Sequence, residues 1–211
     1  MKTACVSLLF GVCVLLLSAL TVSAVSLSVS PNLQQFFSGS SSASSVSLSC
    51  VDDDGQTVDG WTVKRTRGGL TEDCGAAAGF EMVHGSSCVV DRSVSSDGSY
   101  FCVNSSGQQS DEVSIIVSDK GAILEIPALP VRTGSNVTLR CRERSGDTAA
   151  AFFSFNGRHV GSDLKSELII TNIQQSNEGF YSCATDKSGT STQSFLRVRG
   201  QSSDITSCLQ T

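Results

Sequence analysis

The sequence predicts an all-β protein with two tandem β-sandwich domains. Apolar and polar residues alternate along the expected strands, which is the pattern of antiparallel sheets with one buried face. No helical periodicity is found after residue 24. Two motifs recur in the second half of the chain: Val46-x-Leu48-x-Cys50 as Val137-x-Leu139-x-Cys141, and Gly98-x-Tyr100-x-Cys102 as Gly179-x-Tyr181-x-Cys183.

The length and composition fit one or two small domains. The chain has 211 residues, 39% of them hydrophobic, nine cysteines and a formal net charge of −5. An acidic chain without a basic tract offers no electrostatic attraction to phosphate backbones. We therefore expect no nucleic-acid partner.

Residues 1–24 have the layout of a secretory signal peptide. A mostly apolar run over 6–17 is followed by the small residues 18–24, which place Val22 and Ala24 at the positions before a cleavage site. The alternative, a membrane anchor, needs about 20 apolar residues, and the apolar stretch covers 4–20 with serines inside it. We expect cleavage after Ala24, no membrane span in the rest of this chain, and a secreted or cell-surface (extracellular) protein.

The remaining chain divides into a first domain over 25–118, a second domain over 119–199 and a C-terminal tail over 200–211. The first ends with Val113-x-Ile115-x-Val117, and about four residues from Ser118 to Gly121 lead into the second. A connector this short predicts a fixed bend rather than free tumbling.

Both domains resemble the immunoglobulin superfamily over roughly residues 27–199. The repeated cysteines lie 52 and 42 residues apart, with Trp61 eleven residues after Cys50 and Phe153 twelve after Cys141. The resemblance implies a disulfide between two sheets, a bulky ring packed on it, and a tyrosine hydroxyl that bonds to the upstream backbone. Ser96 and Asn177 stand where the family usually has an aspartate.

The cysteines left after cleavage are expected to form three bridges. The repeat and the resemblance imply Cys50–Cys102 and Cys141–Cys183, and Cys74–Cys88 nests inside the first pair. This nested bridge closes about 15 residues, worth about 3 kcal/mol in the loop-entropy model. A metal site with His84 is the alternative, but it supplies too few ligands. Cys208 is the spare cysteine, either bound to a partner by a disulfide or inert.

Surface features add two further expectations. Asn104 and Asn136 begin N-glycosylation motifs, and the strand pattern turns Asn136 outward. Asp52, Asp53 and Asp54 lack the ligand spacing of a calcium loop, so an exposed turn is favoured.

Catalysis is not expected. His84 and His159 are the only histidines, and neither lies in a nucleophile elbow or a zinc-protease motif. No phosphate-binding glycine loop is present in the sequence. We expect no enzyme activity, no cofactor and no metal, which leaves recognition of a protein ligand.

The second domain resembles the membrane-proximal domain of Fc receptors and Fc receptor-like proteins. The resemblance is carried by three stretches: residues 130–141, 152–158 and 168–173. It implies an immune receptor that binds immunoglobulin Fc or another protein through the linker and loops 142–149, 158–165 and 186–191. Fc-gamma receptors commonly clasp an Fc proline between two tryptophans, whereas this chain has one, so a non-immunoglobulin ligand stays open. An adhesion or secreted decoy module is the alternative.

Charge points to the second domain as the ligand-binding part. The net charge is −7 over 25–118 and +2 over 119–199, although scattered solvated charges would give a similar imbalance. We expect Arg92 of the first domain to lie outside the ligand surface. The predicted ligand-binding residues are Arg142, Arg144, Arg158, His159 and Lys187.

Overall fold

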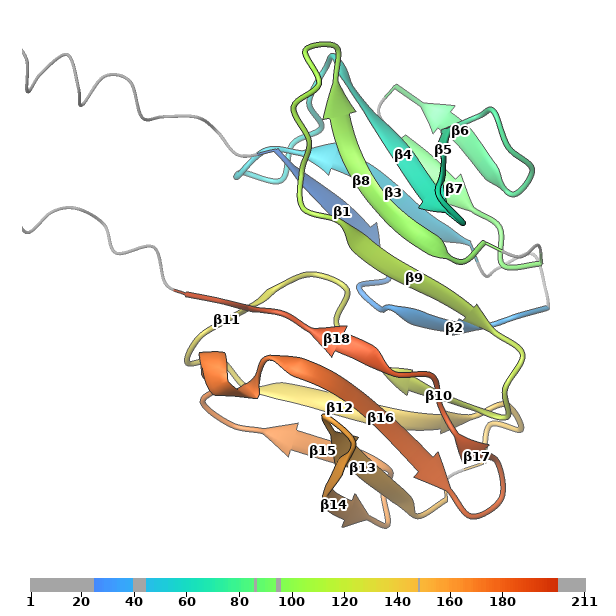
Figure 1. The fold of residues 1–211 in the computed structure, drawn as a ribbon, viewed down its shortest axis with the longest axis vertical. Helices are drawn as coiled ribbons and strands as arrows, with labels where there is room; N and C mark the ends of the chain where they lie inside the picture. The colour runs from blue at the N-terminus through green and yellow to red at the C-terminus, as the bar shows by residue number, and fades with distance from the viewer. Residues whose placement is uncertain (1–24, 40–44, 86, 94–95, 148, 201–211) are drawn as a thin grey trace, which may run out of the picture.

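The computed structural model describes residues 25–39, 45–85, 87–93, 96–147 and 149–200. Two β-sandwiches lie against each other, and β9 leads from the first into the linker and β10 of the second (Figure 1). Each sandwich has its own hydrophobic core, and Ala128 of the second unit packs into the core of the first. The predicted all-β architecture of two tandem sandwiches is confirmed, and the proposed boundary between 118 and 119 falls between β9 and β10.

The first unit, residues 25–118, packs two sheets face to face. One sheet has the spatial order β1 (Ser26–Ser30), β3 (Val46–Val51), β7 (Ser87–Val90), β6 (Phe80–His84). The other has the order β2 (Gln35–Phe37), β9 (Val113–Ser118), β8 (Gly98–Asn104), β4 (Trp61–Arg67), β5 (Leu70–Asp73).

The second unit, residues 119–199, repeats this plan with shorter strands. One sheet contains β10 (Ala122–Glu125), β12 (Val137–Glu143) and β15 (Glu167–Ile170). The other has the order β14 (Arg158–Asp163), β13 (Ala151–Phe155), β16 (Gly179–Thr185), β17 (Gly189–Thr190), with β18 (Ser194–Leu196) also paired to β16. The remaining elements are β11 (Val131–Arg132), β19 (Val198–Arg199) and the short 3-10 helix η1 (Gln175–Asn177).

The N-terminal edge of the first unit is divided between its two sheets. β1 pairs antiparallel with β3, and after the cis Ser30–Pro31 peptide the chain crosses to the other sheet. There β2 pairs in parallel with β9, the last strand of the unit. The second unit repeats this division, because β10 pairs with β12 and β11 pairs in parallel with β19. The crossing places β2 beside the second unit.

The three disulfides of the structure join the cysteine pairs proposed from the sequence: Cys50–Cys102, Cys74–Cys88 and Cys141–Cys183. The predicted strand alternation is also observed, since the apolar members of both repeated motifs are buried. Two of the disulfides cross between the sheets of a sandwich, and Cys74–Cys88 ties the segment after β5 to β7.

The tyrosine corner implied by the resemblance is present in both units. The Tyr100 hydroxyl donates to the Ser96 carbonyl at 2.6 Å, and the Tyr181 hydroxyl donates to the Asn177 carbonyl at 2.9 Å. The glycine two residues before each tyrosine is required by close packing. A Cβ on Gly179 would lie 2.5 Å from the Phe155 ring.

The ring in the first core comes from an unexpected strand. Val63, not Trp61, pairs with Cys102, just as Phe153 pairs with Cys183 in the second unit. Trp61 is two residues earlier on β4 and lies half-buried at the margin of the core. The aromatic ring is supplied instead by Phe80 of β6, which is fully buried and meets Tyr100 edge to face at 5.5 Å between ring centroids.

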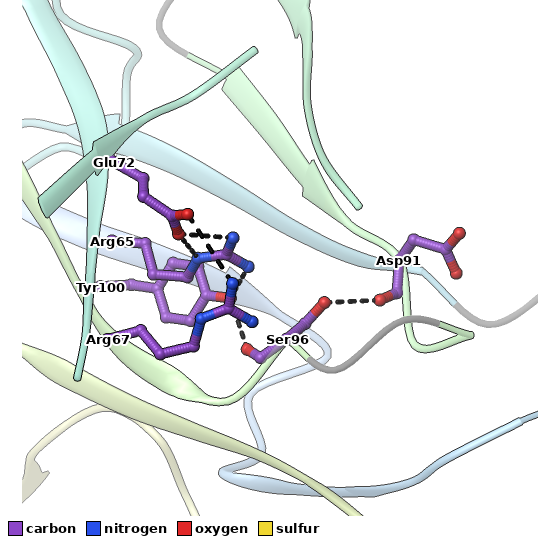
Figure 2. A network of polar contacts seen from close by, with 6 residues as sticks. All are labelled: Arg65, Arg67, Glu72, Asp91, Ser96 and Tyr100. Atoms are coloured by element: carbon purple, nitrogen blue, oxygen red, sulfur yellow. Dashed lines mark hydrogen bonds and ion pairs between the residues drawn. The ribbon is translucent and has the colours of Figure 1, made fainter. Parts of the chain in front are cut away.

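A buried arginine joins this ring cluster to the sheet edge (Figure 2). The side chain of Arg65 is 0% exposed, and its Nε donates to Glu72 at 2.7 Å. Its Nη2 meets the same carboxylate as an ion pair at 2.6 Å, without the geometry of a directed hydrogen bond. Burial acts to lower the pKa of Arg65, but its bonds to Tyr100 and Glu72 outweigh burial and raise the pKa. The charge is thereby kept inside the sandwich, where an unpaired one would be costly.

Several predictions fall outside the described residues. These are the signal peptide, Cys208 and all of the tail except Gly200. Within the described ranges no helix is long and apolar enough to cross a membrane. Asn136 is exposed, as the alternation along its strand predicts. Asn104 is half-buried, and its side-chain amide donates to the Gln108 side chain. Glycosylation of both asparagines stays a prediction.

Tyrosine ionisation provides a test of both corners, because Tyr100 and Tyr181 are the two tyrosines of the chain. Burial raises the pKa of each above the usual value. In the unfolded chain the tyrosine hydroxyls lose their protons near pH 10, whereas in the folded protein they keep them to higher pH. The free energy of unfolding therefore falls as the pH rises above about 10. An absorbance titration is expected to detect tyrosinate only together with loss of the β-sheet circular dichroism signal. Reversible ionisation near pH 10 in the folded protein would contradict both corners. The control is Tyr100→Phe, which leaves one tyrosine and should halve the absorbance change.

Candidate functional site

Two glutamines of the first unit bind the second unit. Gln34 and Gln35 are 4% and 0% exposed. The Gln35 amide nitrogen donates to the Thr192 carbonyl at 2.7 Å, and its oxygen accepts the Leu124 N–H at 3.0 Å. The Gln34 amide donates to the Phe195 carbonyl at 2.8 Å. Between them the glutamines bond to Leu124 of β10 and Phe195 of β18, which belong to different sheets of the second unit.

Arg144 closes the same junction from the second unit. It follows β12, and its guanidinium donates to the Ser38 carbonyl at 2.8 Å and the Ser118 carbonyl at 2.6 Å. The guanidinium carbon also lies 4.8 Å from the centroid of the Phe37 ring. Arg144 thus connects the second unit to the ends of both β2 and β9, and its donors are used within the chain.

A cleft of about 410 Å³ opens beside this junction. Its walls come from both units: Phe36, Phe37 and Arg92 from the first, and Glu125, Arg142 and Arg144 from the second. Arg142 pairs with Glu125 at 2.8 Å, yet the Arg142 side chain is 58% exposed. The cleft therefore combines apolar walls with three guanidinium groups. Glu125 is the one carboxylate among the described residues that line it.

Arg92 and Arg142 line the same cleft from different units. The Arg92 guanidinium carbon lies 5.4 Å from the centroid of the Phe36 ring. Burial lowers the pKa of Arg92, and the positive charge of Arg142 lowers it further. The positive charges of the two units therefore act on each other at this cleft.

Of the five predicted ligand-binding residues, three lie toward the linker. Arg142 and Arg144 are at the C-terminal end of β12, and Lys187 is exposed in the turn after β16. Arg158 and His159 lie elsewhere, because they follow the Asn156–Gly157 turn and pair with Phe155 and Ser154 of β13. These β13 residues are opposite the beginning of β16, on the order of 20 Å of extended chain from Lys187. The five residues therefore do not form one surface.

Arg92, expected to lie outside the ligand surface, lines the same cleft as Arg142, and its place relative to a ligand stays a prediction. Arg92 lies in the loop after β7, and the crossing of the chain into β2 brings this loop to the cleft that Arg142 lines. Neither the lone Arg92 nor Glu125 belongs to a sequence motif, so no pattern could have identified them. Gln34 and Gln35 could have been noticed in the sequence, because this polar pair stands between Leu33 and two phenylalanines. Polar side chains in an otherwise apolar segment need hydrogen-bond partners when they are buried.

The sequence left metal binding as an alternative at two places, the Cys74–Cys88 loop and the aspartates 52–54. Among the described residues no group of three or more potential metal ligands is found. Cys74 and Cys88, the possible metal ligands, are joined by a disulfide. The Asp52 carboxylate accepts the N–H groups of Asp54 and Gln56 at 3.0 and 2.9 Å, which makes this segment an aspartate-stabilised turn.

Comparison with known proteins finds a family match in the second unit. Residues 127–196 match the family model of the immunoglobulin domain. No curated protein matches the chain.

The chain also resembles solved tandem structures. A structure of Dscam has 17% identity and a TM-score of 0.32, covering 84% of this chain and 47% of that one. The N-terminal four Ig domains of Dscam1 isoform 6.9 have 19% identity and a TM-score of 0.31, covering 85% and 47%. A chimeric titin Z1Z2 tandem has 18% identity and a TM-score of 0.30, covering 82% and 99%. The chain thus spans about half the length of the Dscam structures. At these scores neither function nor domain arrangement carries over.

The junction is tested by Gln35→Ala. The substitution leaves the buried Leu124 N–H and Thr192 carbonyl without partners, each costing about 1–3 kcal/mol. Because these groups lie between the units, we expect small-angle X-ray scattering to report a larger radius of gyration and calorimetry to resolve two transitions. Gln56→Ala, at an exposed turn, is the matched control and should behave as the wild type. An unchanged scattering profile for Gln35→Ala would mean that the glutamine does not hold the units together.

Proposed function

We propose that the protein is an extracellular recognition module that binds a protein ligand at the cleft between its two units. In the narrower form of this proposal it is an immune receptor ectodomain of the Fc receptor-like type, secreted or presented at the cell surface. The observation that carries the proposal is the cleft itself, in which Arg92 and Arg142 of different units face one open space.

The position of the cleft supports recognition of a macromolecule. The loop over 142–149 lies at the linker, because the Arg144 N–H donates to the Gly121 carbonyl at 2.8 Å. The Ser166 hydroxyl, just after the loop over 158–165, donates to the Ala149 carbonyl. The turn after β16 is adjacent too, because a Cβ on Gly121 of the linker would lie 3.0 Å from the Ser188 carbonyl. Cleft and loops therefore offer adjoining contact surfaces on the second unit.

The predicted glycans would leave this surface open. Asn104 is at the end of β8, and this strand runs antiparallel to β9, away from the linker. Asn136 precedes β12, whose opposite end carries Arg142. Carbohydrate at either position would cover the ends of the sandwiches that lie away from the cleft.

A second candidate function is that of an adhesion or decoy module with a non-immunoglobulin ligand. The number of tryptophans in the chain favours it. Trp61 is the one tryptophan of the chain and packs against the first core. It leaves no tryptophan pair to clasp an Fc proline, which favours an adhesion or decoy module with a non-immunoglobulin ligand. A ligand panel that includes both kinds of protein decides between them.

The test is surface plasmon resonance of the secreted protein against immunoglobulins and a panel of leucocyte surface proteins. For the ligand that binds, Arg142→Ala is expected to weaken binding by about tenfold or more, as at a central interface arginine. Arg158→Ala, at the start of β14, should change it by less than about twofold. The exposed Arg197, changed to Ala, is the charge-matched control.

The proposed site would be contradicted if Arg158→Ala abolished binding while Arg142→Ala left it unchanged. Binding to immunoglobulin Fc alone would favour the receptor form of the proposal. Binding to another surface protein alone would favour the adhesion or decoy form.

A further inference from the structure

Three arginines of the second unit have no ion pair among the described residues. They are Arg132 on β11, Arg199 on β19, and Arg197, which lies between β18 and β19. All three residues are exposed, and no side-chain hydrogen bond is found for them within the described ranges. Five basic side chains on other strands are instead paired with carboxylates: Lys64, Arg65, Arg67, Arg140 and Arg142.

Strand alternation and register place the three arginines on one face. Over residues 194–199 buried side chains alternate with outward-facing ones, and the outward set is Phe195, Arg197 and Arg199. β11 pairs in parallel with β19, so that Arg132 stands opposite Arg199. Opposed residues of neighbouring strands have their Cα atoms about 5 Å apart, and every second residue along a strand is about 7 Å further on. The three guanidinium groups therefore share one exposed surface.

Two aromatic rings continue this surface. Phe195 pairs with Phe180 of β16, a strand that lies beside β18 (Figure 1). The two rings meet edge to face with 5.0 Å between their centroids, and Phe180 is 49% exposed. From Phe195 to Arg199 the strand covers about 13 Å. We call the rings and the arginines together the arginine stripe: Phe180, Phe195, Arg132, Arg197 and Arg199.

We propose that the arginine stripe binds a sulfated polysaccharide. The inference goes beyond the proposed function, since both the surface and the ligand differ from those of the cleft. Each sulfate group carries a permanent negative charge and several oxygen acceptors, to which guanidinium groups donate charge-assisted hydrogen bonds. One sulfate can accept from Arg132 and Arg199, which stand opposite each other, and the next sulfate from Arg197. The apolar face of a sugar ring can pack on Phe180 and Phe195.

The stripe and the cleft lie at opposite ends of the second unit. β12 begins at Val137, five residues after Arg132, and Arg142 of the cleft is about 17 Å further along this strand. The predicted glycan at Asn136 would leave the stripe open as well. The Asn136 side-chain oxygen accepts the Asn172 N–H at 2.9 Å, so this side chain is turned toward the segment after β15 and away from β19.

The location of the stripe favours a sulfated polysaccharide over other polyanions. Anionic phospholipids are concentrated in the cytoplasmic leaflet, which an extracellular protein does not meet. An acidic peptide carries each carboxylate on a flexible side chain that has to be ordered on binding, whereas sulfates are attached close to the sugar rings. Asp111 and Glu178 line the same open pocket as Arg197 and Arg199. Because these carboxylates repel a polyanion on that flank, we expect contact with a short segment of the polysaccharide.

The test is isothermal titration calorimetry of the secreted protein with a heparin octasaccharide at several salt concentrations. The comparison probes are the same octasaccharide without sulfates, a ten-residue glutamate peptide, and vesicles that contain phosphatidylserine. Arg132→Gln and Arg199→Gln should each raise the Kd of the octasaccharide about tenfold. Each should also lower the slope of log Kd against log salt concentration by about one, because one ion contact is lost. Arg140→Gln, which removes the same charge from β12, is the matched control and should change the Kd by less than about twofold.

The inference is wrong if the octasaccharide without sulfates binds equally well, or if the glutamate peptide or the vesicles bind more tightly. It is also wrong if Arg140→Gln weakens binding as much as Arg199→Gln, or if both stripe variants bind as the wild type does. Circular dichroism establishes that the variants are folded. Binding that is detected only after Asn136→Gln would mean that carbohydrate covers the stripe in the secreted protein, and would contradict the inference too. The cleft is tested separately by Arg142→Ala in surface plasmon resonance, so failure of one proposal leaves the other standing.

Discussion

The arrangement of the two sandwiches depends on the buried side chains of Gln34 and Gln35. Their strand, β2, is the edge strand of one unit, and an edge strand normally presents its backbone to solvent. Here the edge is covered by the second unit, and the glutamine amides satisfy backbone groups there that would otherwise be buried without partners. An unsatisfied buried polar group costs about 1–3 kcal/mol, so the second unit cannot slide or rotate without losing several such bonds together.

The cleft follows from this constraint. Arg92 belongs to one unit and Arg142 to the other, so the space between them exists only while the units keep one relative orientation. Arg144 reinforces that orientation at the linker by bonding to Ser38 and Ser118. The side chains that line the cleft are thereby positioned before any ligand arrives. Pre-organisation of this kind lowers the cost of binding, because the ligand need not order the site.

The strand alternation and the disulfide pairs could be predicted from the sequence, whereas contacts that depend on strand register or on the junction could not. The alternation around Cys50 and Cys141 is a local consequence of strands with one buried face, and it predicted the strands and their inward residues. The spacing assigned Trp61 to the centre of the first core, but Trp61 lies at its margin, and the fully buried ring is that of Phe80 from another strand. Arg158 was grouped with Arg142 for the same reason. Strand register, not distance along the sequence, decides which end of a sheet a residue occupies.

The central claim is that the two units form one rigid body with the arginine cleft between them. It is tested most directly by residual dipolar couplings of the backbone amides, measured in a single weakly aligned sample and fitted separately for residues 25–118 and 119–199. A rigid junction predicts one alignment tensor, with the same magnitude and orientation in both fits when the units are placed as in Figure 1. Tensors of clearly different magnitude would mean that the units reorient independently, and would contradict a cleft built by their junction.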